Sequence, residues 1–118
     1  MKSRSYRDLV AWQRGLDLYG QVFLVSKSFP ADEMYGMTSQ MRRAASSIPS
    51  NIAEGQKRGS TKEFAHFLRI AYGSCAELDT QIELCFSVGY INKARRDELA
   101  ASVNELMKII NGLIDAIA

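Results

Sequence analysis

A strict apolar repeat occupies the C-terminal part of the chain. Its members alternate at spacings of four and three residues, and they are Leu99, Val103, Leu106, Ile110, Leu113 and Ile117. Side chains at this spacing lie on one stripe of an α-helix, whereas the side chains of a half-buried strand alternate at every second residue. The repeat therefore predicts an amphipathic helix that packs its apolar stripe against other parts of the chain.

Three earlier segments show the same periodicity and predict three further helices. The first, at about residues 6–27, carries the stripe Leu9, Trp12, Leu16, Tyr19 and Phe23. The second, at about 31–57, carries Met34, Met37, Met41, Ala44 or Ala45, Ile48 and Ile52. The third follows a capping box, in which Ser60 and Glu63 bond each other's backbone amides, and it carries Phe64, Leu68, Ala71, Cys75, Leu78, Ile82 and Cys85.

The breaks between these segments are only a few residues long. Pro30 ends the first segment and Gly89 ends the third. Within the second segment, Pro49 predicts a kink, or else Gly36 predicts a break. Short connections make successive helices antiparallel neighbours. We therefore expect an all-α protein, an antiparallel up-down-up-down four-helix bundle with a kinked second helix, in a single domain over residues 1–118.

Composition and cysteine spacing agree with a small helical protein of the cytoplasm. The 118 residues include 13 Ala and 10 Leu but only 8 Val and Thr together, a balance that favours helix over strand. Cys75 and Cys85 lie about 15 Å apart on one predicted helix, too far for a disulfide, so both are interpreted as small core residues in a reducing compartment. The segment from Met1 to Asp8 lacks the apolar stretch of a secretion signal, and no apolar run suggests a membrane partner.

Positive charge gathers in the first two thirds of the chain. Residues 1–75 hold 11 Lys and Arg against 6 Asp and Glu, whereas residues 76–118 hold 4 against 7. The candidate nucleic-acid-binding residues lie where this excess is densest, and they are Arg42, Arg43, Lys57, Arg58, Lys62 and Arg69. Basic side chains beside a helix start suit a phosphate backbone, because the first amides of the helix also attract anions. The alternative is a solvated basic surface that only maintains solubility.

A polar stripe on the second predicted helix suggests a structural hydrogen-bond network. Asn51 and Glu54 belong to this stripe, and Ser74 and Glu77 on the third helix are their expected partners. His66 is the single histidine, too few for a zinc site or for a nucleophile with its own base. We therefore expect no enzymatic activity, no metal and no cofactor. A catalytic site built from Asn51, Glu54 and His66 is the weakest of the functional hypotheses.

The fourth predicted helix carries apolar residues outside its main stripe. Met107, Ile109 and Ile114 lie off that stripe, and a helix that is apolar on more than one face needs a second surface to bury. Self-association is the economical explanation. The alternative is a monomer with a slightly apolar C-terminal helix, because single exposed apolar residues are common.

The sequence also resembles a known family. The resemblance is carried by the run from Phe29 to Gly55, above all by Ile48-Pro49-Ser50-Asn51-Ile52-Ala53-Glu54-Gly55, and by flanking matches in the other helices. These residues are similar to the signature of the 23S rRNA intervening-sequence proteins. By position, Arg58 also belongs to that signature, and Arg42 and Arg43 match its basic pair.

The resemblance implies a four-helix bundle that assembles as a homopentamer and has no attached enzymatic activity. It also extends to an accessory protein of diversity-generating retroelements, which associates with nucleic acid and a reverse transcriptase. Two hypotheses follow. The first is a non-enzymatic, homo-oligomeric accessory factor that binds RNA or DNA through the basic face. The alternative is a scaffold for a protein partner, with no role in nucleic-acid binding.

Overall fold

Four long helices dominate residues 5–118, which is the part of the chain that the computed structural model describes. Their bounds are Val10–Ser26 (α1), Ser39–Lys57 (α2), Thr61–Ser87 (α3) and Lys93–Ile117 (α4). A short 3-10 turn, Tyr6–Asp8, precedes α1. Residues 5–118 contain no β-strand, so the prediction of an all-α protein with four helices is confirmed. We expect no secretion signal in the segment from Met1 to Asp8, and residues 1–4 of that segment lie outside the described part of the chain.

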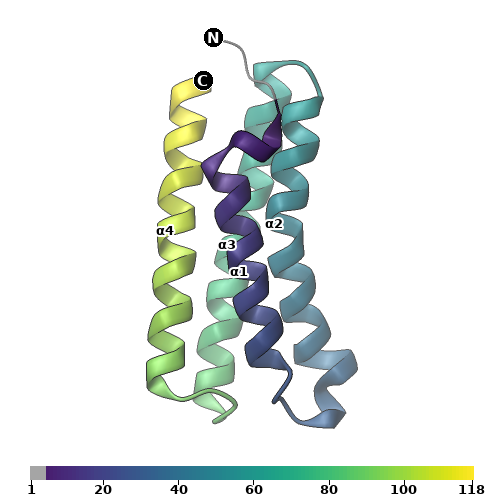
Figure 1. Ribbon diagram of the computed structural model, residues 1–118, viewed down its shortest axis with the longest axis vertical. Coiled ribbons are helices and arrows are strands. Elements are labelled where there is room, and N and C mark those ends of the chain that lie inside the picture. Colours follow the sequence, from purple (N-terminus) through teal and green to yellow (C-terminus); the bar gives the residue numbers. More distant parts are fainter. Residues whose placement is uncertain (1–4) are drawn as a thin grey trace.

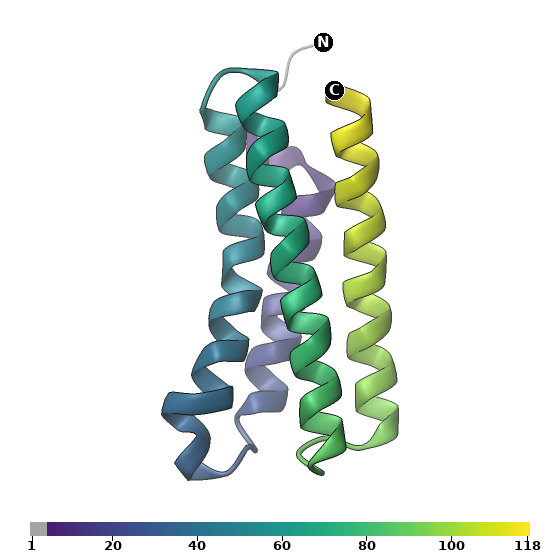
Figure 2. The ribbon, with the colours of Figure 1, turned by 180° about the vertical axis from the view of Figure 1, so that it is seen from behind.

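The helices lie side by side along a rod that measures 46 × 24 × 19 Å (Figure 1). In Figure 1 the chain runs down α1, up α2, down α3 and up α4, so each helix runs opposite to the one before it. The most extensive helix–helix contact joins α2 to α3, which a short turn connects at the end where α1 begins (Figure 2). None of the described helices combines the length and hydropathy needed to cross a lipid bilayer.

The irregular backbone of the second segment lies at Gly36. α2 continues through Pro49 as one helix, and the segment before it forms a 3-10 turn and a π-helical turn (Met34–Thr38). Gly36 departs from helical geometry, with φ −112° and ψ −113°. The Glu33 carboxylate accepts a hydrogen bond from the amide of Met37 at 2.9 Å, and a Cβ at position 36 would lie 2.7 Å from the same carboxylate oxygen. A side chain at position 36 would therefore displace the Glu33 carboxylate from this hydrogen bond.

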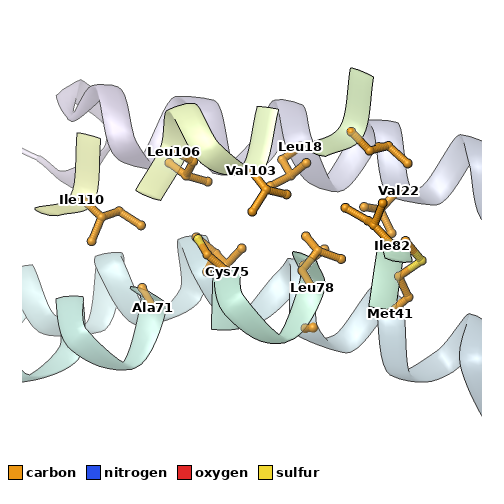
Figure 3. Close-up of a cluster of buried hydrophobic side chains, with 14 of the residues drawn as sticks. Leu18, Val22, Met41, Ala71, Cys75, Leu78, Ile82, Val103, Leu106 and Ile110 are labelled. Atoms are coloured by element: carbon orange, nitrogen blue, oxygen red, sulfur yellow. The ribbon is translucent and has the colours of Figure 1, made fainter. Parts of the chain in front are cut away.

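Side chains from all four helices meet in one core along the rod (Figure 3). Figure 3 labels Leu18, Val22, Met41, Ala71, Cys75, Leu78, Ile82, Val103, Leu106 and Ile110. Both cysteines are free and buried, as expected. Burial raises the pKa of Cys75 to about 12 and that of Cys85 to about 11, so both thiols stay protonated and act as small apolar side chains.

The predicted stripe is correct for α3 but only partly correct for the first segment, of which Leu9, Trp12 and Tyr19 pack against the core. Leu16 is 46% exposed and Phe23 is 38% exposed, although both belong to the predicted stripe of α1. The side of α1 that faces the core instead carries Ala11, Gly15, Leu18, Val22 and Ser26. The reason is close packing, because a Cβ at Gly15 would lie only 3.2 Å from Cδ of Pro49. Met34, predicted to lie in the apolar stripe of the second segment, is likewise 48% exposed.

The expectation of a second exposed apolar face on the fourth helix is wrong. Ile114 is only 8% exposed, and Met107 and Ile109 are partly buried against the core. α4 contacts both α1 and α3, so a wide arc of the helix faces the inside of the bundle. Among the described residues, the large exposed apolar side chains include four on α1, which are Val10, Leu16, Phe23 and Leu24.

Candidate nucleic-acid interface

The turn between α2 and α3 places basic residues from both helices at one end of the bundle (Figure 2). Gly59 has a φ of +90°, a conformation that glycine adopts without strain. The Ser60 hydroxyl then accepts a hydrogen bond from the amide of Glu63 at 3.1 Å, which confirms this part of the predicted capping box. As a result, Lys57, the last residue of α2, and Lys62, in the first turn of α3, are only a few residues apart.

Basic side chains on the outward face of α3 have no carboxylate partner among the described residues. Lys62, His66 and Arg69 are all exposed, as their four-three spacing predicts. Lys57, at the end of α2, is exposed as well. Within residues 5–118, no ion pair involves Lys57, Lys62 or Arg69. These three residues, which we call the α3 basic surface, therefore keep their full charge available for an anionic partner.

Arg58 lies beside the α3 basic surface, but neighbouring carboxylates compensate its charge. Its guanidinium donates to Glu54 at 2.7 Å and lies 3.9 Å from a carboxylate oxygen of Glu63. The same group stacks over the ring of Phe67, 4.9 Å from the ring centroid. The hydrogen bond with Glu54 raises the pKa of Arg58 above its ordinary value. Arg58 therefore offers a phosphate only a part of its charge.

A surface hollow of about 580 Å³ opens between these groups. Its lining includes Arg58, Lys62, His66 and Phe67. The His66 ring meets the Phe67 ring edge-on, with their centroids 5.4 Å apart. Because the hollow lies at the first turns of α3, the positive end of the helix dipole adds to the charge of Lys62.

Arg42 lies on a different face of α2. It stacks over Phe23 of α1, with the guanidinium carbon 4.5 Å from the ring centroid, and it donates to the Ser26 hydroxyl at 2.8 Å. Arg42 is thus held between α1 and α2 near the opposite end of the rod from Lys57 and Lys62. The six candidate binding residues do not form one continuous patch in the structure.

Arg43 borders a separate groove on the α2–α3 side of the molecule. This α2–α3 groove has a volume of about 390 Å³, and its lining includes Gln40, Arg43, Ser47, Asn51, Ile70 and Ser74. The Arg43 guanidinium donates to the Ser39 hydroxyl at 3.2 Å. No ion pair of Arg43 occurs within the described residues.

The polar contacts between α2 and α3 differ from the expected network. The bond that crosses between the helices joins the Ser47 and Ser74 hydroxyls at 2.7 Å. Asn51 donates within its own helix, to the backbone oxygen of Ser47 at 2.7 Å. Glu54 bonds Arg58, the residue that follows α2, and the carboxylate of Glu77 has no hydrogen bond or ion pair in residues 5–118.

The polar stripe predicted on the second segment also includes Gln40 and Ser47, and both line the groove with Asn51. The sequence contained a signal for one feature that we did not predict. Glu54 and Arg58 are four residues apart on a helix, a spacing that favours an ion pair. Within residues 5–118, no three His, Cys, Asp or Glu side chains are grouped as metal ligands.

The sequence comparisons place this fold within a family. The model of the 23S rRNA-intervening sequence protein family matches residues 7–112, nearly the whole chain. The chain belongs to this family. A crystal structure from Bacteroides thetaiotaomicron, described as a protein of unknown function from the S23 ribosomal protein family, is 24% identical and superposes with a TM-score of 0.81. The match covers 89% of this chain and 98% of that one, and it shows the shared fold.

No curated protein matches the sequence. Membership of the 23S rRNA-intervening sequence family and the similarity to the S23 structure therefore bring no molecular function with them. The α3 basic surface and the α2–α3 groove are the features of this protein's own surface that could bind a partner.

Proposed function

We propose that this member of the 23S rRNA-intervening sequence family is a non-enzymatic, homo-oligomeric accessory factor that binds RNA or DNA. Contact with the phosphate backbone is made by the α3 basic surface, which consists of Lys57, Lys62 and Arg69. The observation that carries the proposal is the lack of any carboxylate partner for these three cations in residues 5–118. Surface lysines and arginines without partners release counterions when they bind phosphates.

The arrangement of the surface favours low sequence specificity. Lys62 and Arg69 lie seven residues apart on the same outward face of α3, about 10 Å along the helix axis. Contacts of this kind position a nucleic acid but do not read its bases. A single protomer offers few such contacts, so binding by one copy is expected to be weak.

Assembly would multiply these weak contacts. The family resemblance suggests a homopentamer, and we propose an oligomer in which the α3 basic surface is repeated around a ring. Exposed apolar residues on α1, such as Leu16 and Leu24, offer a surface for contacts between copies. Repetition of a weak site raises the overall affinity through avidity, without any further contact per protomer.

Salt dependence tests the proposal. Fluorescence anisotropy with a labelled RNA, measured from about 50 to 200 mM salt, should give an affinity that falls linearly on a log–log plot. The variant Lys62→Ala should reduce the slope by about 0.7–0.9 for each protomer that contacts the RNA, because each such protomer neutralises one phosphate fewer. The matched control is Lys108→Ala, which removes one exposed lysine from α4.

The two variants distinguish binding by the α3 basic surface from binding that depends only on the net charge of the protein. An equal effect of Lys62→Ala and Lys108→Ala would mean that only the net charge of the protein matters. An affinity that does not change with salt, or no binding at low salt, would contradict the proposed function.

The alternative function is a scaffold for a protein partner. It is favoured by the exposed apolar residues of α1, of which Leu24 is 68% exposed, and by Tyr35, which is 96% exposed before α2. Under this alternative the same anisotropy series shows no salt-dependent binding of RNA, and Lys62→Ala has no effect. The salt series thus distinguishes the two functions.

A further inference from the structure

The α2–α3 groove exists because small side chains line the contact between the two helices. Ala44, Ser47 and Ser74 are too short to fill the space, and the hydroxyls of Ser47 and Ser74 bond each other at its floor. The groove follows the hollow at Arg58 and Lys62 along the same pair of helices. Position 70 of α3 is one turn beyond Phe67, which lines the hollow.

Side-chain amides in this groove have hydrogen-bonding capacity that the fold leaves unused. Asn51 uses one amide N–H to bond the backbone of its own helix, and its Oδ1 has no partner in the described residues. The Gln40 side chain, which also lines the groove, has no hydrogen-bond partner within residues 5–118. Each amide group can both donate and accept, as the polar edge of a nucleic-acid base also does.

The charges around the groove suit a base inside it and phosphates at its two ends. Glu77 lines the groove and repels a phosphate there, whereas its carboxylate can accept from an exocyclic amino group of a base. Cations lie at both ends, with Arg58 and Lys62 at one end and Arg43 at the other.

One apolar side chain completes the site. Ile70 is 40% exposed and lies at the rim of the groove, beside the amide of Asn51. The flat face of a base is apolar and its edge is polar, so a base seated in the groove could cover Ile70 while its edge bonds Asn51. Gln40 lies about 16 Å further along α2, where a neighbouring base of the same strand could reach it. A phosphate alone would leave both the apolar contact and the amides unused.

We propose that the α2–α3 groove binds an unpaired base of single-stranded nucleic acid, and that phosphates of the same strand, several nucleotides apart, contact Arg43 and Lys62. This inference rests on the proposed function and specifies its ligand as a single strand. A base within a duplex has its pairing edge occupied, so a duplex cannot present that edge to Asn51.

Abasic oligonucleotides separate the base from the phosphates. We would compare a short labelled single strand with a strand of the same length that carries abasic sites, using anisotropy at low salt. The base-bearing strand should bind about fivefold more tightly, the effect expected from one or two additional hydrogen bonds and an apolar contact. Asn51→Leu, which keeps a similar volume but removes the amide, should abolish this difference and leave the affinity for the abasic strand unchanged.

Two control variants complete the design. Asn104→Leu removes an exposed amide on α4, outside the groove, and should change neither affinity. Lys62→Ala should weaken both strands by a similar factor, because it removes a phosphate contact. Retained binding of the abasic strand by Asn51→Leu also shows that this variant is folded.

Each remaining outcome is decisive. Equal affinity of the unmodified protein for the two strands overturns the base-binding groove and leaves the proposed function intact. A base preference that persists in both Asn51→Leu and Gln40→Leu also overturns it, because the base is then bound elsewhere. If neither strand binds, the proposed function fails and this inference fails with it.

Discussion

Arg42 and Arg69 carry the same guanidinium group but have different surroundings. Arg42 is half-buried, stacked on Phe23 and bonded to Ser26, so its charge and its planar face are used to join α1 to α2. Arg69 is exposed and has no ion pair within residues 5–118. The environment of each arginine, more than its chemical type, determines which of the two can meet an external phosphate.

This contrast predicts opposite effects of two alanine substitutions. Arg42→Ala should lower the free energy of unfolding by about 1–2 kcal/mol, because the substitution removes a charged hydrogen bond and a cation–π interaction. Arg69→Ala should leave stability within about 0.5 kcal/mol and weaken RNA binding. Urea unfolding and anisotropy measure the two properties. Weaker RNA binding by a fully folded Arg42→Ala protein would show that Arg42 contributes to the interface after all.

At the scale of the helices, glycines decide how closely the elements approach. Gly55, near the end of α2, faces Phe67 of α3, and a Cβ there would lie 2.5 Å from Cβ of that residue. This contact brings the end of α2 against α3 beneath Arg58, at the edge of the α3 basic surface. Gly20 on α1 has no neighbour within 4 Å of such a Cβ.

The two glycines should therefore respond differently to alanine. Gly55→Ala should destabilise the protein by about 1–3 kcal/mol, because the backbones of α2 and α3 must separate. Gly20→Ala is the matched control and should stabilise it by about 0.5–1 kcal/mol through the higher helix propensity of alanine. Thermal unfolding followed by circular dichroism measures both changes. A Gly55→Ala protein as stable as Gly20→Ala would contradict the close approach of α2 to α3.

The helices were predictable where large aliphatic side chains repeat. The stripes of α3 and α4 consist of such residues, so periodicity identified their buried faces. α1 packs most closely through the small residues Ala11 and Gly15. The periodicity of its large apolar side chains therefore did not identify this face. For the candidate site, the exposure of Lys62 and Arg69 followed from their spacing. The spacing did not predict that Arg42 points toward α1, because spacing within one helix does not identify the helix that lies beside each of its faces.

At the scale of the whole molecule, the path of the chain determines where positive charge gathers. The connection between α2 and α3 brings Lys57 and Lys62 to one end of the rod, and Arg69 extends this surface along α3. The cations of α4 are compensated in large part, since Lys93, Arg95 and Arg96 all pair with carboxylates. Within residues 5–118, the unpaired cations of α3 and of the end of α2 therefore gather at one surface, whereas Arg43 and Lys108, which also lack an ion pair, lie apart from it.

Crosslinking locates the nucleic acid on this surface most directly. RNA that contains 4-thiouridine would be bound at low salt, irradiated, and the crosslinked peptides identified by mass spectrometry. We predict crosslinks within residues 57–77, together with the stretch of α2 that lines the groove, and their disappearance as salt is raised. Crosslinks confined to α1 and α4, or unchanged at high salt, would contradict the assignment of the interface to α2 and α3.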